Sequence, residues 1–105
     1  MNGFQLTFYT QQSRSHHHQP IGEWLLTQIQ ALNIRGATLS TALEGIGHDH
    51  RLHSAHFFDL ADQPVIVTVV VSESECNQLL LRLRDEHDLH LFYVKTPVEF
   101  GAIGA

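Results

Sequence analysis

The chain has 105 residues, 43% of them hydrophobic, and a formal net charge of −5 with neutral histidines, which indicates one globular domain over residues 1–105. Its six Lys and Arg residues are scattered, and this argues against a nucleic-acid partner, because phosphate backbones are held by clustered cations. We find neither an apolar run of about 18 residues nor a signal-peptide pattern, so we expect no membrane insertion and a cytoplasmic location.

The first half of the chain predicts a strand, a helix and a second strand. Residues 4–9 alternate between apolar and polar with the period of two that is typical of a strand, and residues 11–19 form a polar loop. Pro20 suits the first turn of a helix, because its missing N–H would have no partner there. Apolar residues at helical spacing follow and define one buried stripe: Ile21, Trp24, Leu25, Ile29 and Leu32. Residues 33–36 end this helix, and a strand is expected over about 37–43.

The second half predicts a long loop, a strand, a helix and a last strand. Residues 44–53 form an exposed loop, and residues 54–60 are expected to be extended. The run VIVTVVV, residues 65–71, is the clearest strand. Ser72 and Glu75 form a capping box that starts the second helix, and its buried face would contain Cys76, Leu79, Leu80 and Leu83. The last strand is expected over residues 89–94, with a tail from Pro97 onward.

This β-α-β-β-α-β order predicts an α+β fold, a ferredoxin-like two-layer sandwich with a four-stranded antiparallel sheet whose first and third strands are central. Two helices cover one face of such a sheet. The third strand, however, carries Ile66 and Val70 on one side and four valines on the other. Burial of both sides needs a further layer, which self-association would supply. The alternative is that residues 54–60 or the C-terminal tail fold over the open face.

Five motifs in a fixed order carry a resemblance to a known family. They are LTFYT at residues 6–10, QPIGEWLLTQIQALNIRGATL at 19–39, EGIG at 44–47, RLHS at 51–54 and DLADQPVIVTVVV at 59–71. Together they resemble the domain-of-unknown-function-190 family of PII-like proteins over about residues 6–94.

The resemblance implies a homotrimer in which three sheets pack into a central core, and a signalling role rather than an enzymatic one. It implies a small effector, often an adenine nucleotide, in clefts between subunits. The loop from Glu44 to Gln63 would change conformation and contact a target protein, for which a membrane transporter is one candidate. Its own residues predict that it is mobile in the free protein, because it has few apolar anchors before Ala55, many charges and two glycines.

Candidate effector-binding residues lie at and near this loop. Gly45 and Gly47 would let backbone amides approach a ligand, although turn geometry alone also explains them. Arg51 is the cation of the loop and Arg14 a second candidate for a phosphate, with a solvated arginine as the alternative. His53 matches the Arg-x-His element of the family. The tail has no basic residue of the kind with which PII proteins hold phosphates, so we expect an effector with few phosphates.

The histidines of the loop support a second hypothesis, a metal-binding trimer resembling the CutA group. Neutral imidazoles bind divalent zinc, copper or nickel, and four of them are candidate ligands: His48, His50, His53 and His56. A triple histidine at residues 16–18 adds three nitrogens in another loop. Against a metal site, no cysteine or carboxylate completes a familiar ligand spacing here.

Overall fold

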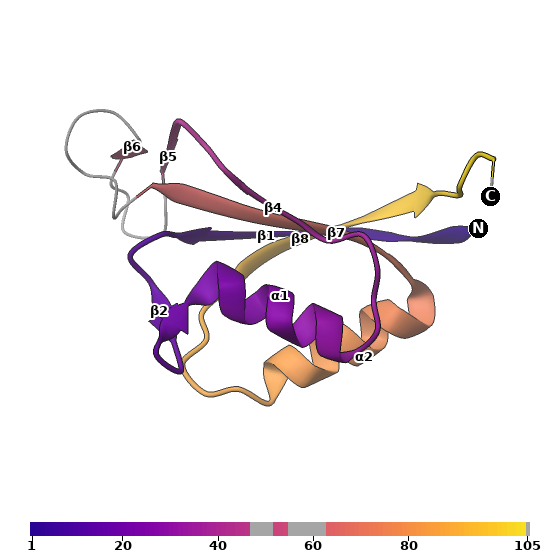
Figure 1. Ribbon diagram of the computed structural model, residues 1–105, viewed down its shortest axis with the longest axis horizontal. Coiled ribbons are helices and arrows are strands. Elements are labelled where there is room, and N and C mark those ends of the chain that lie inside the picture. Colours follow the sequence, from indigo (N-terminus) through magenta and orange to yellow (C-terminus); the bar gives the residue numbers. More distant parts are fainter. Residues whose placement is uncertain (47–51, 55–62, 105) are drawn as a thin grey trace.

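The computed structural model describes residues 1–46, 52–54 and 63–104. Its elements in chain order are β1 (Asn2–Gln11), β2 (Ser15–His16), β3 (Gln19–Pro20), α1 (Ile21–Ala31), β4 (Thr38–Thr41), β5 (Glu44–Ile46), β6 (Leu52–Ser54), β7 (Pro64–Ser72), α2 (Glu73–Arg84) and β8 (Phe92–Glu99). Four strands form one sheet in the order β4-β7-β1-β8, and every neighbouring pair is antiparallel. Both helices lie against one side of this sheet (Figure 1). The predicted ferredoxin-like α+β fold, with β1 and β7 at its centre, is confirmed.

Both helices begin where their sequences predict. α1 starts directly after Pro20, which takes the N-cap position. In the capping box of α2, the backbone N–H of Glu75 donates to the Ser72 hydroxyl at 3.2 Å, and the N–H of Ser72 donates to the Glu75 carboxylate at 2.9 Å. α1 ends in a turn in which Asn33 has a φ of 59° and Gly36 a φ of 78°. Neither helix of the described residues is long and apolar enough to cross a bilayer.

The core lies between the helices and the sheet. The face of β7 that contacts the helices contains Val65, Val67, Val69 and Val71, each no more than 3% exposed. Leu6 and Phe8 of β1 lie on the same face, and the predicted stripe of α1 and the predicted face of α2 pack onto them. Burial of a large aliphatic or aromatic side chain contributes roughly 1.5–3 kcal/mol. The two central strands therefore hold the domain together.

The last strand is longer and later than predicted. We expected residues 89–94 with a tail from Pro97, but β8 runs from Phe92 to Glu99 and Pro97 pairs with Phe4. β8 is an edge strand, where a residue without an N–H is tolerated. Leu89 is instead a buried core residue in the connection after α2. The prediction was wrong because β1 begins at Asn2 and offers hydrogen bonds as far as Glu99.

The helix-free face of the sheet carries several large apolar side chains among polar ones. Directly opposed residues of antiparallel strands share a face, so Ile66, Tyr9 and Phe92 form one row across it. Val94 lies in the next row, opposite Thr7, and Val70 lies in the row after that, opposite Gln5. Tyr9 is 43% exposed and Val94 41%. Residues 101–104 of the tail are themselves exposed, so these residues do not fold over the face as the alternative required. Residues 55–60, the other segment of that alternative, lie outside those described.

Candidate functional site

The base of the loop from Glu44 to Gln63 is held at one end of the sheet by backbone hydrogen bonds. The N–H of Ala42, just after β4, donates to the carbonyl of Pro64 at 3.0 Å. The N–H of Gln12, just after β1, donates to the carbonyl of Gln63 at 2.9 Å. Three chain segments therefore meet where the loop leaves and rejoins the sheet.

Above this base, β5 and β6 form a short antiparallel ribbon. In its register Gly45 lies opposite His53, and Ile46 lies opposite Leu52. The structure thus brings together two of the predicted effector-binding residues, one from each side of the loop. Gly47 and Arg51 lie outside the described residues. Residues 44–46, 52 and 53 were expected to be loop and residue 54 extended, whereas the structure pairs 44–46 with 52–54 as a ribbon.

Arg14 lies in the connection between β1 and β2, where its guanidinium bonds to the backbone. Its two terminal nitrogens donate to the carbonyl oxygens of Leu89 and His90, each at 2.7 Å. These bonds fasten the connection after β1 to the connection before β8. A ligand phosphate at Arg14 would have to replace these two hydrogen bonds. Phosphate binding by Arg14 would therefore cost free energy that a solvent-exposed arginine would not lose.

The described residues leave little enclosed space at the loop base. A cavity of about 10 Å³ lies there, between the end of β1, the start of α1 and the facing strands, roughly the space of one water molecule. It is lined by Gln11, Gln12, Pro20, Gly22, Glu23, Leu39 and Val65. Sites for small ligands commonly need about 300 Å³ or more. A nucleotide at this position would need walls beyond these residues, from the rest of the loop or from another subunit.

Thr10 adds one polar group close to the same end of β1. Its side chain is buried, and its hydroxyl has no hydrogen-bond partner among the described residues. An unsatisfied buried hydroxyl costs roughly 1–3 kcal/mol. A polar partner for Thr10 would remove this cost.

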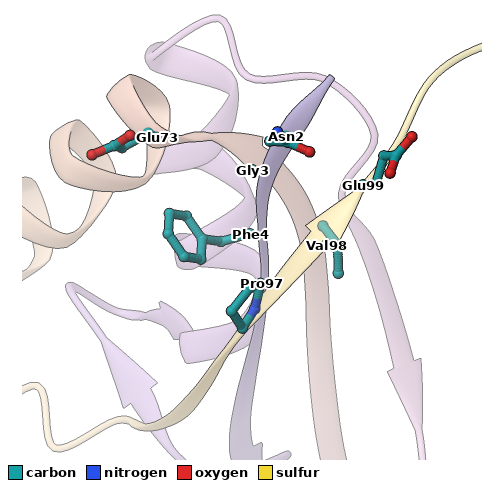
Figure 2. Close-up of a pocket in the computed structure, with 7 residues that line it drawn as sticks. All are labelled: Asn2, Gly3, Phe4, Glu73, Pro97, Val98 and Glu99. Carbon is teal, nitrogen blue, oxygen red and sulfur yellow. The ribbon is translucent and has the colours of Figure 1, made fainter.

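A larger pocket of about 360 Å³ lies at the opposite end of the sheet. Figure 2 shows it between the start of β1, the end of β8 and the first turn of α2. Its lining residues are Asn2, Gly3, Phe4, Glu73, Pro97, Val98 and Glu99. Glu73 and Glu99 are acidic and none of the seven is basic. The pocket therefore disfavours a phosphate-bearing ligand.

A cluster of three ionisable side chains joins the β2 hairpin to the connection after α2, which passes beside β2 in Figure 1. Nε2 of His16 donates to Oε1 of Glu86 at 2.7 Å, and Nε2 of His17 donates to the same oxygen at 2.8 Å. Arg82 donates to the other carboxylate oxygen at 2.9 Å. The His16 ring packs edge-on against Trp24 with 4.4 Å between ring centroids. We call His16, His17 and Glu86 the two-histidine cluster.

Local backbone geometry brings the two histidines to one side. β2 and β3 form a hairpin with His17 and His18 as its two-residue turn, and their φ values are 50° and 67°. Positive φ at both positions is typical of a type I′ turn, which glycine and asparagine favour. A non-glycine residue in the left-handed region costs on the order of 1 kcal/mol. The hairpin replaces part of the loop expected over residues 11–19.

The same contacts control the charge of Glu86. Hydrogen bonds from His16, then from Arg82 and His17, lower the pKa of Glu86 from 4.5 to about 2. The carboxylate therefore stays ionised at any physiological pH. Only 17% of this side chain is exposed, whereas His17 is 67% exposed. The cluster presents a fixed negative group beside two imidazoles at the surface.

Sequence reasoning did not identify this cluster. The triple histidine was a visible signal, but nothing nearby in the sequence indicates Glu86, which lies 70 residues from His16. The predicted metal ligands His48, His50 and His56 lie outside the described residues, and His53 lies in β6. The metal site in the loop therefore stays a prediction.

Comparison with known proteins identifies a matching family and several similar solved structures. Residues 3–96 match the DUF190 family, described as "Uncharacterized ACR, COG1993". A search of curated proteins finds no match. Among solved structures, a PII-like signalling protein from Thermus thermophilus is similar with a TM-score of 0.63 and 18% identity, over 92% of this chain and 85% of the other.

Two structures of CPII, a nitrogen regulatory PII-like protein from Thiomonas intermedia, are also similar. The form bound to ADP, AMP and bicarbonate has a TM-score of 0.65 and 18% identity, over 93% of this chain and 89% of CPII. The apo form has a TM-score of 0.65 and 13% identity, over 98% and 96%. At such identities the similarity shows the fold, while the family match covers most of the chain. The chain therefore belongs to the domain-of-unknown-function-190 family that its motifs resemble.

Proposed function

We propose that this protein is a PII-like regulator that binds an adenine nucleotide with few phosphates and signals to a target protein through the loop from Glu44 to Gln63. The observation that carries the proposal is the helix-free face of the sheet. Tyr9, Ile66, Val70 and Val94 lie on this face among polar residues such as Gln5 and Thr7, and a second layer would bury them. Three copies packed through this face would form the homotrimer expected of the family.

Assembly also gives the loop base the walls that it lacks. The described residues enclose only about 10 Å³ there, far less than a nucleotide needs. Similar structures of CPII are bound to ADP, AMP and bicarbonate, which supports an adenine nucleotide as the effector. In this proposal Gly45 and Gly47 allow close backbone approach, and His53, opposite Gly45, contacts the ligand or holds the ribbon.

The supply of cations limits the charge of the effector. Arg51 is the one Lys or Arg in residues 44–63. Arg14 is bonded to two carbonyls, and Arg82 is bonded to Glu86. A triphosphate would need more positive charge than the loop contains, whereas AMP, ADP or a cyclic nucleotide would need less. We therefore expect AMP or ADP to bind more tightly than ATP.

Calorimetric titration with AMP, ADP, ATP and cyclic AMP tests this proposal, with bicarbonate present or absent. Saturable binding of AMP or ADP is expected, and Arg51→Ala should weaken it without changing the mass of the assembly. Arg35→Ala, an exposed arginine just after α1, is the matched control and should bind as the wild type does. If no nucleotide saturates at millimolar concentration, the adenine-nucleotide proposal is wrong.

A further inference from the structure

The two-histidine cluster has the ligand types of a transition-metal site. Two neutral imidazoles and one carboxylate suit Zn²⁺, Cu²⁺ and Ni²⁺, whereas Ca²⁺ and Mg²⁺ prefer oxygen ligands alone. The ligand atoms of His16, His17 and Glu86 all lie within 4.8 Å of one another. They come from a hairpin and from the residues after α2, two parts of the chain that packing already holds together.

The distances are close to those that a metal ion requires. Two ligand atoms at about 2.0–2.1 Å from a tetrahedral ion lie roughly 3.3–3.4 Å apart. The nitrogens of His16 and His17 now lie 2.7 and 2.8 Å from Oε1 of Glu86. An ion would therefore replace the two hydrogen bonds after each N–O distance opens by about half an ångström, with the proton of each neutral ring on Nδ1 instead of Nε2. His17 is at the exposed hairpin turn and is free to make most of this movement.

The surroundings orient two of the three ligands. The ring of His16 is 11% exposed and lies against Trp24, so its direction is fixed. Arg82 donates to Oε2 of Glu86 and leaves Oε1 directed at the histidines. Hydrogen bonds to ligating carboxylates are typical of metal sites, where they hold the carboxylate in the orientation that binds the ion. The positive charge of Arg82 would repel a bound cation, and the negative charge of Glu86 offsets this repulsion.

We propose that His16, His17 and Glu86 bind one divalent first-row transition ion, with Zn²⁺ as the representative ion. Three protein ligands leave a fourth position of a tetrahedral ion open, and the exposure of His17 places that position at the surface. This site is separate from the effector site of the proposed function and from the predicted loop site at His48, His50, His53 and His56. It stands whether or not the protein binds a nucleotide.

Trp24 makes the site directly observable. It is the only tryptophan in the chain, and its ring lies 4.4 Å from that of His16. The full chain, stripped of metal and then dialysed, is titrated with Cu²⁺ while tryptophan fluorescence is recorded, because a bound paramagnetic ion quenches a neighbouring indole. Isothermal titration with Zn²⁺ then gives the stoichiometry. Both titrations are repeated with the loop variant in which all four loop histidines are replaced by Gln, so that binding in the loop does not contribute.

We expect saturable quenching with one equivalent per chain in the wild type and in the loop variant. Glu86→Gln keeps the size of the side chain and removes its charge, and His17→Gln removes one ligand from an exposed turn. Each should weaken Cu²⁺ and Zn²⁺ binding about tenfold or more. The matched control is His87→Gln, which removes an exposed histidine next to Glu86 and should leave binding unchanged.

Two results would overturn the proposal. One is quenching in His17→Gln and Glu86→Gln with the wild-type midpoint, and the other is no saturable quenching in the loop variant. Circular dichroism of each variant shows whether its fold is kept. His17→Gln alone decides the question if Glu86→Gln loses the contact between the hairpin and the residues after α2, because the His17 ring is largely exposed and its loss removes little packing.

Discussion

Val69 and Val70 are neighbours in β7 with opposite surroundings. Val69 is completely buried against the helices, and Val70 lies partly exposed on the helix-free face. Val70→Glu should therefore give a folded protein that does not assemble, whereas Val69→Glu should not fold. The structure settles which side of the strand contacts the helices, and so it identifies Val70 and Ile66 as the positions at which assembly can be tested.

The loss of assembly free energy expected for Val70→Glu follows from the three copies of this residue in one trimer. An unpaired charge left in an apolar contact costs roughly 3–5 kcal/mol. Three copies in one trimer would oppose assembly by roughly 9 kcal/mol or more, or about 10⁶-fold in the association constant. Such a loss converts the trimer to monomer at micromolar concentration.

Light scattering after size exclusion measures the result. The wild type should have a mass of about 36 kDa, three times the 11.9 kDa chain, and Val70→Glu should have the monomer mass with unchanged circular dichroism. Leu81→Glu adds the same charge on the exposed side of α2 and should remain a trimer. A Val70→Glu protein that keeps the wild-type mass would refute assembly through this face.

Three further predictions concern stability. Ser72→Ala removes the cap of α2 and should lower the free energy of unfolding by about 1 kcal/mol in urea denaturation, whereas Ser74→Ala, exposed in the first turn, should change it little. Because the pKa of Glu86 is lower in the folded protein, the contribution of Glu86 to stability is complete above pH 4.5 and is lost as the pH falls toward about 2. In thermal melting with a chelator present, Glu86→Gln should therefore lose less stability over this pH range than the wild type does. Gly3→Ala would push a methyl group into the backbone carbonyl of β7 and should destabilise by roughly 1–3 kcal/mol, while Gly101→Ala, with open space around it, should melt as the wild type does.

The elements predicted well are those whose signals are local. The period of β7, the helical stripe of α1 and the capping box at Ser72 each lie within about a dozen residues, and each is present in the structure. The order of the strands followed from these elements, because a split β-α-β arrangement places the first and third long strands at the centre.

The features that were missed depend on contacts between distant residues. β8 was placed too early because its bounds are set by its partner β1 and not by its own pattern, so Pro97 was taken as the start of a tail. The pairing of β5 with β6 likewise joins the two sides of a loop. The two-histidine cluster needs a turn with positive φ at His17 and a glutamate 69 residues away, neither of which has a sequence signal.

The most direct test of the proposed function is native mass spectrometry of the wild-type chain with AMP. It reports the number of subunits and the number of bound nucleotides in the same species. We expect a trimer that carries up to three AMP molecules, with the fraction bound rising as AMP is added. The measurement is repeated with ADP and with cyclic AMP. A monomer, or a trimer that binds none of the three nucleotides at millimolar concentration, would contradict the proposed function.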